Sequence, residues 1–106
     1  MDRAELIEKL VRLRSEIKAY GVRVDVVLLF GSRARGENLP DSDYDLAFVS
    51  RDFGKDRLQE GVLLQKLAFG NLSNCDLIPV SLMEYLDPHP ISPIVAEIRR
   101  DGITLL

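Results

Sequence analysis

The segment VDVVLLF at positions 24–30, whose last five residues form an unbroken apolar run, is the feature that most restricts how this chain can fold. Polar and apolar residues alternate at its start and only apolar residues follow, which is typical of a strand whose later part is buried on both faces. The run ends at Gly31-Ser32, where residues 32–37 are expected to open a short helix. A loop over 37–42 and a second strand over 43–49 are expected next.

The rest of the chain shows the spacing of amphipathic helices and of two further strands. Apolar residues three or four apart predict helices over 2–20 and 56–69 and shorter helices over 81–86 and 93–101. Strands are expected over 75–80 and 103–106. The expected core residues of the two longer helices are Leu6, Leu10, Leu13, Ile17, Tyr20, Leu58, Val62, Leu63, Leu67 and Phe69. This order of elements predicts an α+β (mixed α/β) fold with a single small mixed β-sheet of about four strands and helices packed against it.

Size and charge narrow the classes of protein that are possible. A length of 106 residues is expected to form one domain over 1–106. A net charge of −3 argues against direct nucleic-acid binding, which depends on clustered Lys and Arg. The longest apolar run is far shorter than the ~20 residues needed to cross a bilayer, so no membrane association is expected. A charged N-terminal segment and the single cysteine, Cys75, lead us to expect a cytoplasmic protein.

Three aspartates, Asp43, Asp45 and Asp76, lie at the start of predicted strands, where apolar side chains could have stood. Because strand side chains alternate, Asp43 and Asp45 should project from one face about 7 Å apart along the backbone. Asp76 can join them if its strand lies beside theirs. Two carboxylates about 5 Å apart repel by about 3 kcal/mol at an effective dielectric constant of about 20, so such a cluster must splay, hold protons or bind cations. Mg²⁺ is the expected cation, since it prefers oxygen ligands and completes its shell with water and substrate phosphates.

The turn before these aspartates has the composition of a phosphate site. Gly31 would let a phosphate approach the backbone, and the N–H groups of a helix that begins at Ser32 attract anions. Arg33 and Arg35 add two guanidinium groups, which match phosphate oxygens with paired hydrogen bonds. Taken singly, these features also fit a turn and a solvated helix face.

Two better-known motifs do not fit the spacing. GSRARG at 31–36 has the glycines of a P-loop, but Glu37-Asn38 stand where that motif needs Lys followed by Ser or Thr. DSDYDL at 41–46 begins like an EF-hand, yet Leu46 replaces its central Gly and Asp52 its final Glu.

Gly31-Ser32, ten intervening residues, Asp43-x-Asp45 and a further aspartate on a later strand together resemble the nucleotidyltransferases of the DNA polymerase β superfamily. The chain is most similar to the minimal nucleotidyltransferase (MNT) domains of that superfamily, over about residues 24–80 and, less strongly, over the tail PIVAEIRRDGITLL. The resemblance implies that Gly31 and Ser32 hold the nucleotide phosphates and that Asp43 and Asp45 bind metal ions. It also implies that Asp76 is the third carboxylate, which helps to bind the catalytic metal and takes the proton of the acceptor.

The same resemblance implies a reaction and a partner. The expected activity is Mg²⁺-dependent transfer of AMP from ATP to an acceptor hydroxyl, with two Mg²⁺ ions at the carboxylates. Minimal domains of this kind are commonly paired with a helical HEPN toxin protein, so the expected role is that of the antitoxin of a toxin–antitoxin pair, with the toxin as acceptor. Two alternatives stay open: an antitoxin that neutralises its partner by contact alone, and an adenylyltransferase that acts on a small molecule.

Overall fold

The computed structural model describes residues 1–106, which form five helices and four strands. Their bounds lie within a few residues of the predicted ones. In chain order they are α1 (Arg3–Ala19), β1 (Val24–Phe30), α2 (Gly31–Arg35), β2 (Tyr44–Ser50), α3 (Arg57–Ala68), β3 (Cys75–Ser81), α4 (Leu82–Leu86), α5 (Pro93–Asp101) and β4 (Ile103–Thr104).

All four strands lie in one mixed sheet in the order β3-β2-β1-β4. β1 pairs antiparallel with β2 and with β4, whereas β2 and β3 are parallel and are connected through α3. The predicted α+β fold with a mixed four-stranded sheet is therefore confirmed. β4 is shorter than the predicted strand over 103–106, because the regular pairing stops where Leu105 and Leu106 both lie opposite Val27. Both donate a backbone hydrogen bond to the carbonyl of Val27, and the N–H of Val27 donates one to the carbonyl of Leu106.

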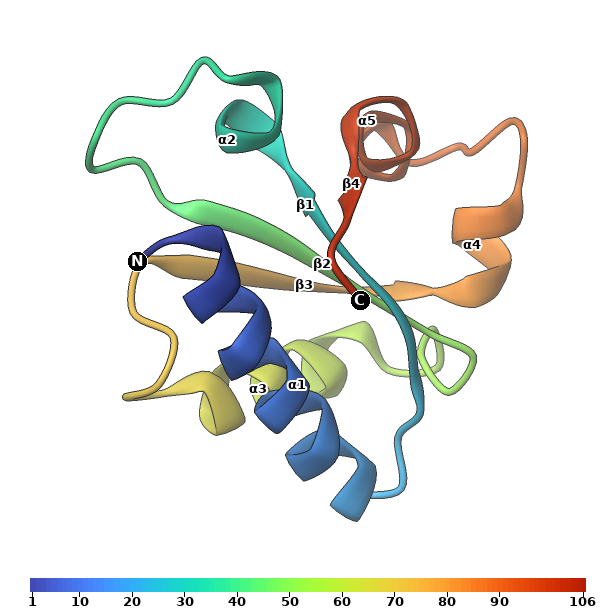
Figure 1. Ribbon diagram of the computed structural model, residues 1–106. Helices are drawn as coiled ribbons and strands as arrows, with labels where there is room; N and C mark the ends of the chain where they lie inside the picture. The colour runs from blue at the N-terminus through green and yellow to red at the C-terminus, as the bar shows by residue number, and fades with distance from the viewer.

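Helices cover both faces of the sheet. In the view of Figure 1, α1 and α3 lie below the sheet, and α2, α4 and α5 lie above it. Alternate strand residues supply the two cores, as a buried central sheet requires. The lower core contains residues such as Leu10, Val27 and Phe48, and the upper core contains residues such as Val49 and Ile98. Burial on both faces of β1 agrees with the apolar run that predicted it.

The predicted core face of α3 is wrong in part. Leu58, Val62 and Phe69 are exposed by 74%, 52% and 87%, whereas Leu64 and Ala68 are fully or almost fully buried. Residues 58–69 carry apolar side chains on more than one side of the helix, so spacing alone could not decide which side faces the sheet. In α1 the predicted residues Leu6, Leu10, Leu13 and Ile17 are buried, but Tyr20 lies beyond the last helical turn and is exposed.

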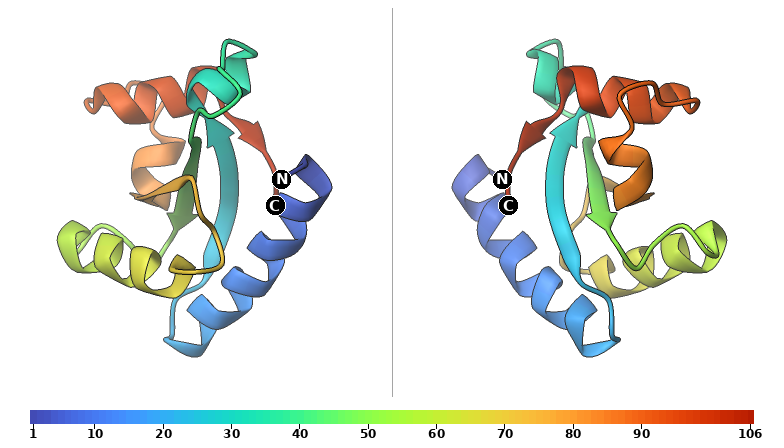
Figure 2. Two further views of the ribbon diagram at one scale, coloured as in Figure 1. Left: turned by 90° about the vertical axis from the view of Figure 1, so that its left-hand side faces the viewer. Right: turned by 90° about the vertical axis from the view of Figure 1, so that its right-hand side faces the viewer.

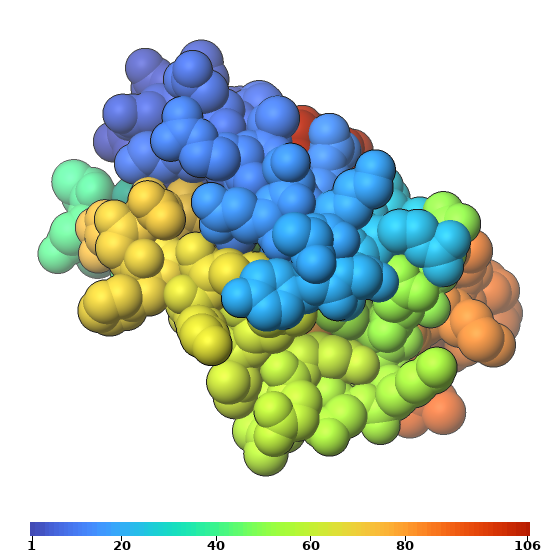
Figure 3. Space-filling view, turned by 90° about the horizontal axis from the view of Figure 1, so that it is seen from below, coloured from blue at the N-terminus to red at the C-terminus, as the bar shows by residue number.

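The two longer helices on the lower face lie side by side. Seen from below, α1 and α3 together cover this side of the molecule (Figure 3). The two views of Figure 2 show α2 and α5 together at the opposite end, above the sheet. None of the helices is both long enough and apolar enough to pass through a membrane.

Candidate active site

Asp45 and Asp76 lie next to each other on neighbouring strands. They are direct partners in the parallel pairing of β2 with β3, where adjacent strands run about 4.8 Å apart. Both side chains project from the upper face of the sheet, the face whose strand residues Ala47 and Val49 contact α5. Asp43 immediately precedes β2, is exposed, and shares the alternation of Asp45. The structure thus brings the three predicted carboxylates to one rim of the sheet.

Asp45 is partly buried and has other carboxylates near it, and both features affect its pKa. Partial burial raises its pKa above the ordinary value for an aspartate, because the charged form loses hydration. The neighbouring carboxylates of Asp76, Glu97 and Asp43 raise it further, and only Arg35 acts in the opposite direction. Asp45 is therefore the centre of an acidic cluster, hereafter the Asp45 cluster, formed by Asp43, Asp45, Asp76 and Glu97.

The Asp45 cluster supplies carboxylate oxygens, which suit a hard divalent ion, but its side chains are not arranged to coordinate one. No group of three His, Cys, Asp or Glu side chains is arranged so that it could hold a metal ion. Carboxylate oxygens are nevertheless the ligands that Mg²⁺ takes in nucleotide enzymes, together with water and substrate phosphates. The chemistry of the residues fits Mg²⁺, and the missing ligands are of the kind that a nucleotide brings.

Gly31 joins the predicted phosphate turn directly to the cluster. It is buried at the junction of β1 and α2 with φ +74°, a backbone conformation that favours glycine. A Cβ atom at this position would lie 2.1 Å from Oδ2 of Asp45, so only a residue without a side chain fits. Ser32 follows with a partly exposed side chain, and no side chain caps the start of α2. The backbone of Gly31 therefore lies directly beside the carboxylate of Asp45.

Arg33 stabilises the loop before β2, which carries Asp43. Its guanidinium donates hydrogen bonds to the carbonyl oxygens of Ser42, at 2.9 Å, and Pro40, at 3.3 Å. It also lies over the ring of Tyr44, 4.0 Å from the centroid, a cation–π contact. These contacts link α2 to the segment just before β2.

Arg35 connects α2 to the C-terminal helix. Its guanidinium forms ion pairs with Glu37 at 2.9 Å, Glu97 at 3.3 Å and Asp101 at 3.6 Å. Glu97 and Asp101 come from α5, which lies beside α2 at the top of the molecule (Figure 2). Arg35 is thus the basic residue of α2 that pairs directly with Glu97, a member of the Asp45 cluster.

Glu97 and Asp101 are site residues that the sequence reasoning missed. They stand four residues apart in the predicted helix 93–101, so they share one side of it, and this spacing was the available signal. Nothing in the local sequence shows that α5 packs beside α2, which is a property of the tertiary fold. The two acids could not have been joined to the site without that contact.

Two other residues of chemical interest take no part in the site. Burial, together with the negative charge of Asp43, raises the pKa of the Cys75 thiol to about 11, so it is protonated at neutral pH and is a poor nucleophile or metal ligand. His89 is exposed in the loop between α4 and α5.

The mixed sheet, the glycine turn and the carboxylates at one rim together define a nucleotidyltransferase domain. The sequence model of the nucleotidyltransferase domain family matches residues 7–100, and the chain belongs to this family. No curated protein sequence matches the chain.

Three solved structures share the fold. A Sulfolobus solfataricus protein assigned as a nucleotidyltransferase superposes with a TM-score of 0.68 at 21% identity, over 96% of this chain and 77% of that one. A toxin–antitoxin complex solved with AMP-PNP gives a TM-score of 0.53 at 18% identity, over 100% of this chain and 73% of that one. A mutant of the MntA–HpeT toxin–antitoxin complex gives 0.52 at 16% identity, with the same coverage of 100% and 73%. At these identities the likeness supports the fold and not a shared substrate.

Proposed function

We propose that this protein transfers AMP from ATP to a hydroxyl group of a partner protein, with Mg²⁺, as the antitoxin of a toxin–antitoxin pair. Membership of the nucleotidyltransferase domain family supports the class of reaction. The observation that supports the proposal most is the close approach of Gly31 to Asp45, where a Cβ on Gly31 would lie 2.1 Å from Oδ2 of Asp45. ATP and a toxin partner are chosen because two structures of this fold are toxin–antitoxin complexes, one of them with AMP-PNP. We take the partner to be a HEPN-type toxin.

Each part of the site has a separate task in this proposal. The backbone of Gly31 and the hydroxyl of Ser32 bind the triphosphate. Asp43, Asp45 and Asp76 would hold two Mg²⁺ ions, which would offset charge on the phosphates and lower the pKa of the acceptor hydroxyl. The acceptor oxygen forms a bond to the α-phosphorus, the α–β phosphate bond breaks, and pyrophosphate leaves. Asp76, exposed at the rim, accepts the proton of the acceptor.

The two arginines act at different distances from the nucleotide. Arg35 pairs with Glu97 of the Asp45 cluster, so it binds phosphate by exchanging Glu97 for the more highly charged triphosphate. Arg33 is engaged with the carbonyls of the loop before β2 and with Tyr44, so its contribution is to fix the loop that carries Asp43.

Transfer can be tested with the protein that the neighbouring gene encodes. The purified chain, Mg²⁺ and ATP labelled at the α-phosphate are mixed with that protein, and label on it is measured. We expect labelling by the wild type, none by Asp43→Ala or Asp45→Ala, and unchanged labelling by Asp41→Ala, a matched exposed aspartate of the same loop. Circular dichroism should show that all variants fold. Equal labelling by wild type and Asp45→Ala would contradict the proposal.

Neutralisation by contact alone is the second candidate, and it is favoured by the absence of a preformed group of metal ligands. The double variant Asp43→Asn/Asp45→Asn separates the two. If it still suppresses the toxicity of the co-expressed neighbour, binding is sufficient. If suppression is lost although the variant folds and still binds the neighbour, transfer is required.

A further inference from the structure

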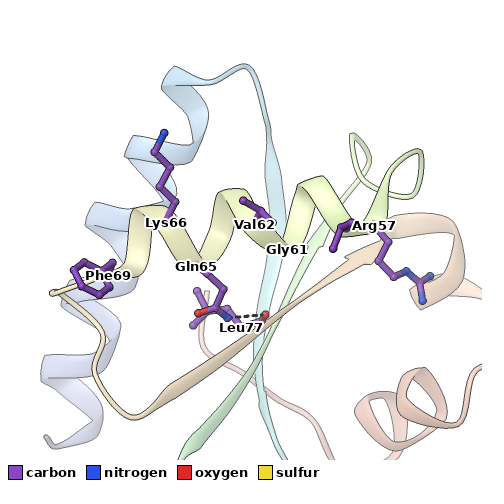
Figure 4. Close-up of a pocket in the computed structure, with 8 residues that line it drawn as sticks. Arg57, Gly61, Val62, Gln65, Lys66, Phe69 and Leu77 are labelled. Atoms are coloured by element: carbon purple, nitrogen blue, oxygen red, sulfur yellow. Dashed lines mark hydrogen bonds between the residues drawn. The ribbon is translucent and has the colours of Figure 1, made fainter.

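A shallow groove lies on the outer side of α3, on the opposite face of the sheet from the Asp45 cluster. Its volume is about 790 Å³, and it is lined by residues of α3 and by Leu77 of β3 (Figure 4). Hereafter we call it the α3 groove. Its lining residues are Arg57, Leu58, Gly61, Val62, Gln65, Lys66, Phe69 and Leu77.

Three large apolar side chains of the α3 groove are exposed to solvent. Leu58, Val62 and Phe69 are exposed by 74%, 52% and 87%. With Gln65 they stand four, three and four residues apart, so they form one stripe along the helix. The stripe covers three turns, or about 17 Å of helix axis. An apolar stripe of this spacing is the surface that a second helix packs against.

The edge of the sheet beside the α3 groove does not favour an added strand. β3 is an edge strand, yet Pro79 within it has no backbone N–H to donate. The carbonyl of Leu77 already accepts a hydrogen bond from Nε2 of Gln65, at 3.4 Å (Figure 4). A partner must therefore bind through side chains, which again favours a helix.

The charged residues of the α3 groove indicate which kind of partner helix would bind there. Its only charged lining residues are basic, Arg57 at one end and Lys66 near the other, although the chain as a whole has a net charge of −3. Arg57 is paired with Glu84, at 2.6 Å, whereas Lys66 forms no ion pair. The acid of α3 nearest to the groove, Glu60, is engaged by the backbone N–H groups of Gly54, Lys55 and Asp56.

We propose that the α3 groove binds an amphipathic helix of another protein whose apolar stripe is flanked by Asp and Glu. A second copy of this chain is disfavoured, because it would bring the same basic residues and no acidic partner for Lys66. The inference does not depend on the proposed transfer reaction, since the α3 groove and the Asp45 cluster lie on different faces of the sheet.

The test uses the full chain and two synthetic helical peptides of about 18 residues, or five turns. Both peptides carry leucines with the four-three-four spacing of the stripe; one has glutamates at the flanking positions and the other has lysines there. Binding of fluorescein-labelled peptide is followed by fluorescence anisotropy, and sedimentation velocity of the free protein reports self-association.

We expect the glutamate peptide to bind at least about tenfold more tightly than the lysine peptide. Val62→Glu should weaken its binding at least about tenfold, and Lys66→Glu should reverse the preference between the peptides. Ile91→Glu is the matched control: Ile91 is also exposed but lies outside the groove, so binding should not change.

Three outcomes would overturn the proposal: equal binding of both peptides, glutamate-peptide binding that Val62→Glu leaves unchanged, or no binding of either peptide. Self-association of the wild type that Val62→Glu abolishes would instead assign the groove to a second copy of the chain.

Discussion

Replacement of Gly31 by alanine should damage stability and activity together, because this residue meets two separate requirements. Its φ of +74° favours glycine, and its hydrogen faces Oδ2 of Asp45 at a distance where a Cβ would be 2.1 Å away. Gly36 offers a matched control, since it also has φ +74° but nothing within 4 Å of an added Cβ. The pair of variants separates the backbone requirement from the contact with the site.

The size of each effect follows from these two features. Left-handed backbone costs an ordinary residue about 1–2 kcal/mol, so Gly36→Ala should lower the free energy of unfolding by that amount. Gly31→Ala has the same backbone cost and also forces the carboxylate of Asp45 out of its rotamer, which adds about 0.5–1.5 kcal/mol. The total for Gly31→Ala is then about 1.5–3.5 kcal/mol.

Urea denaturation followed by circular dichroism measures both changes. A double-mutant cycle identifies the origin of the excess: in an Asp45→Ala background only the Cβ of residue 45 remains, at 3.2 Å, so the cost of Gly31→Ala should fall by about 1 kcal/mol. In the labelling assay Gly36→Ala should remain active, whereas Gly31→Ala should lose transfer because the displaced carboxylate no longer lies beside the phosphates.

Two results would refute this reasoning. One is a Gly31→Ala variant no less stable than Gly36→Ala, which would mean that the contact with Asp45 imposes no constraint. The other is a cost of Gly31→Ala that stays the same in the Asp45→Ala background, which would place the strain elsewhere in the turn.

Three further predictions concern the cluster and the helices. Because the folded state raises the pKa of Asp45, the ionised carboxylate opposes folding at neutral pH. Asp45→Asn should therefore raise the melting temperature of the metal-free protein, and Mg²⁺ should stabilise this variant less than it stabilises the wild type. Thermal unfolding with and without EDTA measures both effects. Glu97→Gln removes a like charge, so an NMR titration should show a lower pKa for Asp45; an unchanged pKa would exclude Glu97 from the cluster. Leu64 lies in the lower core, so Leu64→Ala should lower the free energy of unfolding by about 2–5 kcal/mol. Val62 is exposed, so Val62→Ala should change this free energy by less than about 1 kcal/mol. Similar urea midpoints for the two variants would contradict the orientation of α3.

Local sequence was sufficient for most of the elements and for the grouping of Asp43, Asp45 and Asp76. Period-two alternation fixes which face of β2 carries its aspartates, and the glycine-serine turn stands out because it interrupts an apolar run. The pairing of Asp45 with Asp76 was conditional on β3 lying beside β2, which the structure shows.

The features that sequence could not supply all depend on packing between distant segments. The ion pairs of Arg35 require α5 to lie against α2, more than sixty residues away along the chain. Sequence alone does not determine the orientation of α3, because this helix carries apolar residues on several sides. In the structure α3 packs against β3, and Leu64 and Ala68 are the residues that become buried. The residues left outside by that choice are those of the α3 groove.

The mixed character of the sheet explains why one rim can hold the whole candidate site. β1 runs toward this rim and ends there at Phe30, directly before Gly31, while antiparallel β2 begins there at Tyr44, directly before Asp45. β3 is parallel to β2, so its first residues, including Asp76, also begin at the same rim. With an antiparallel β3 over the same seven residues, Asp76 would instead lie opposite Val49, about 13 Å along the strands from Asp45. The crossover through α3 is therefore what allows a third carboxylate to join the other two, and the same crossover leaves the outer side of α3 free for a partner.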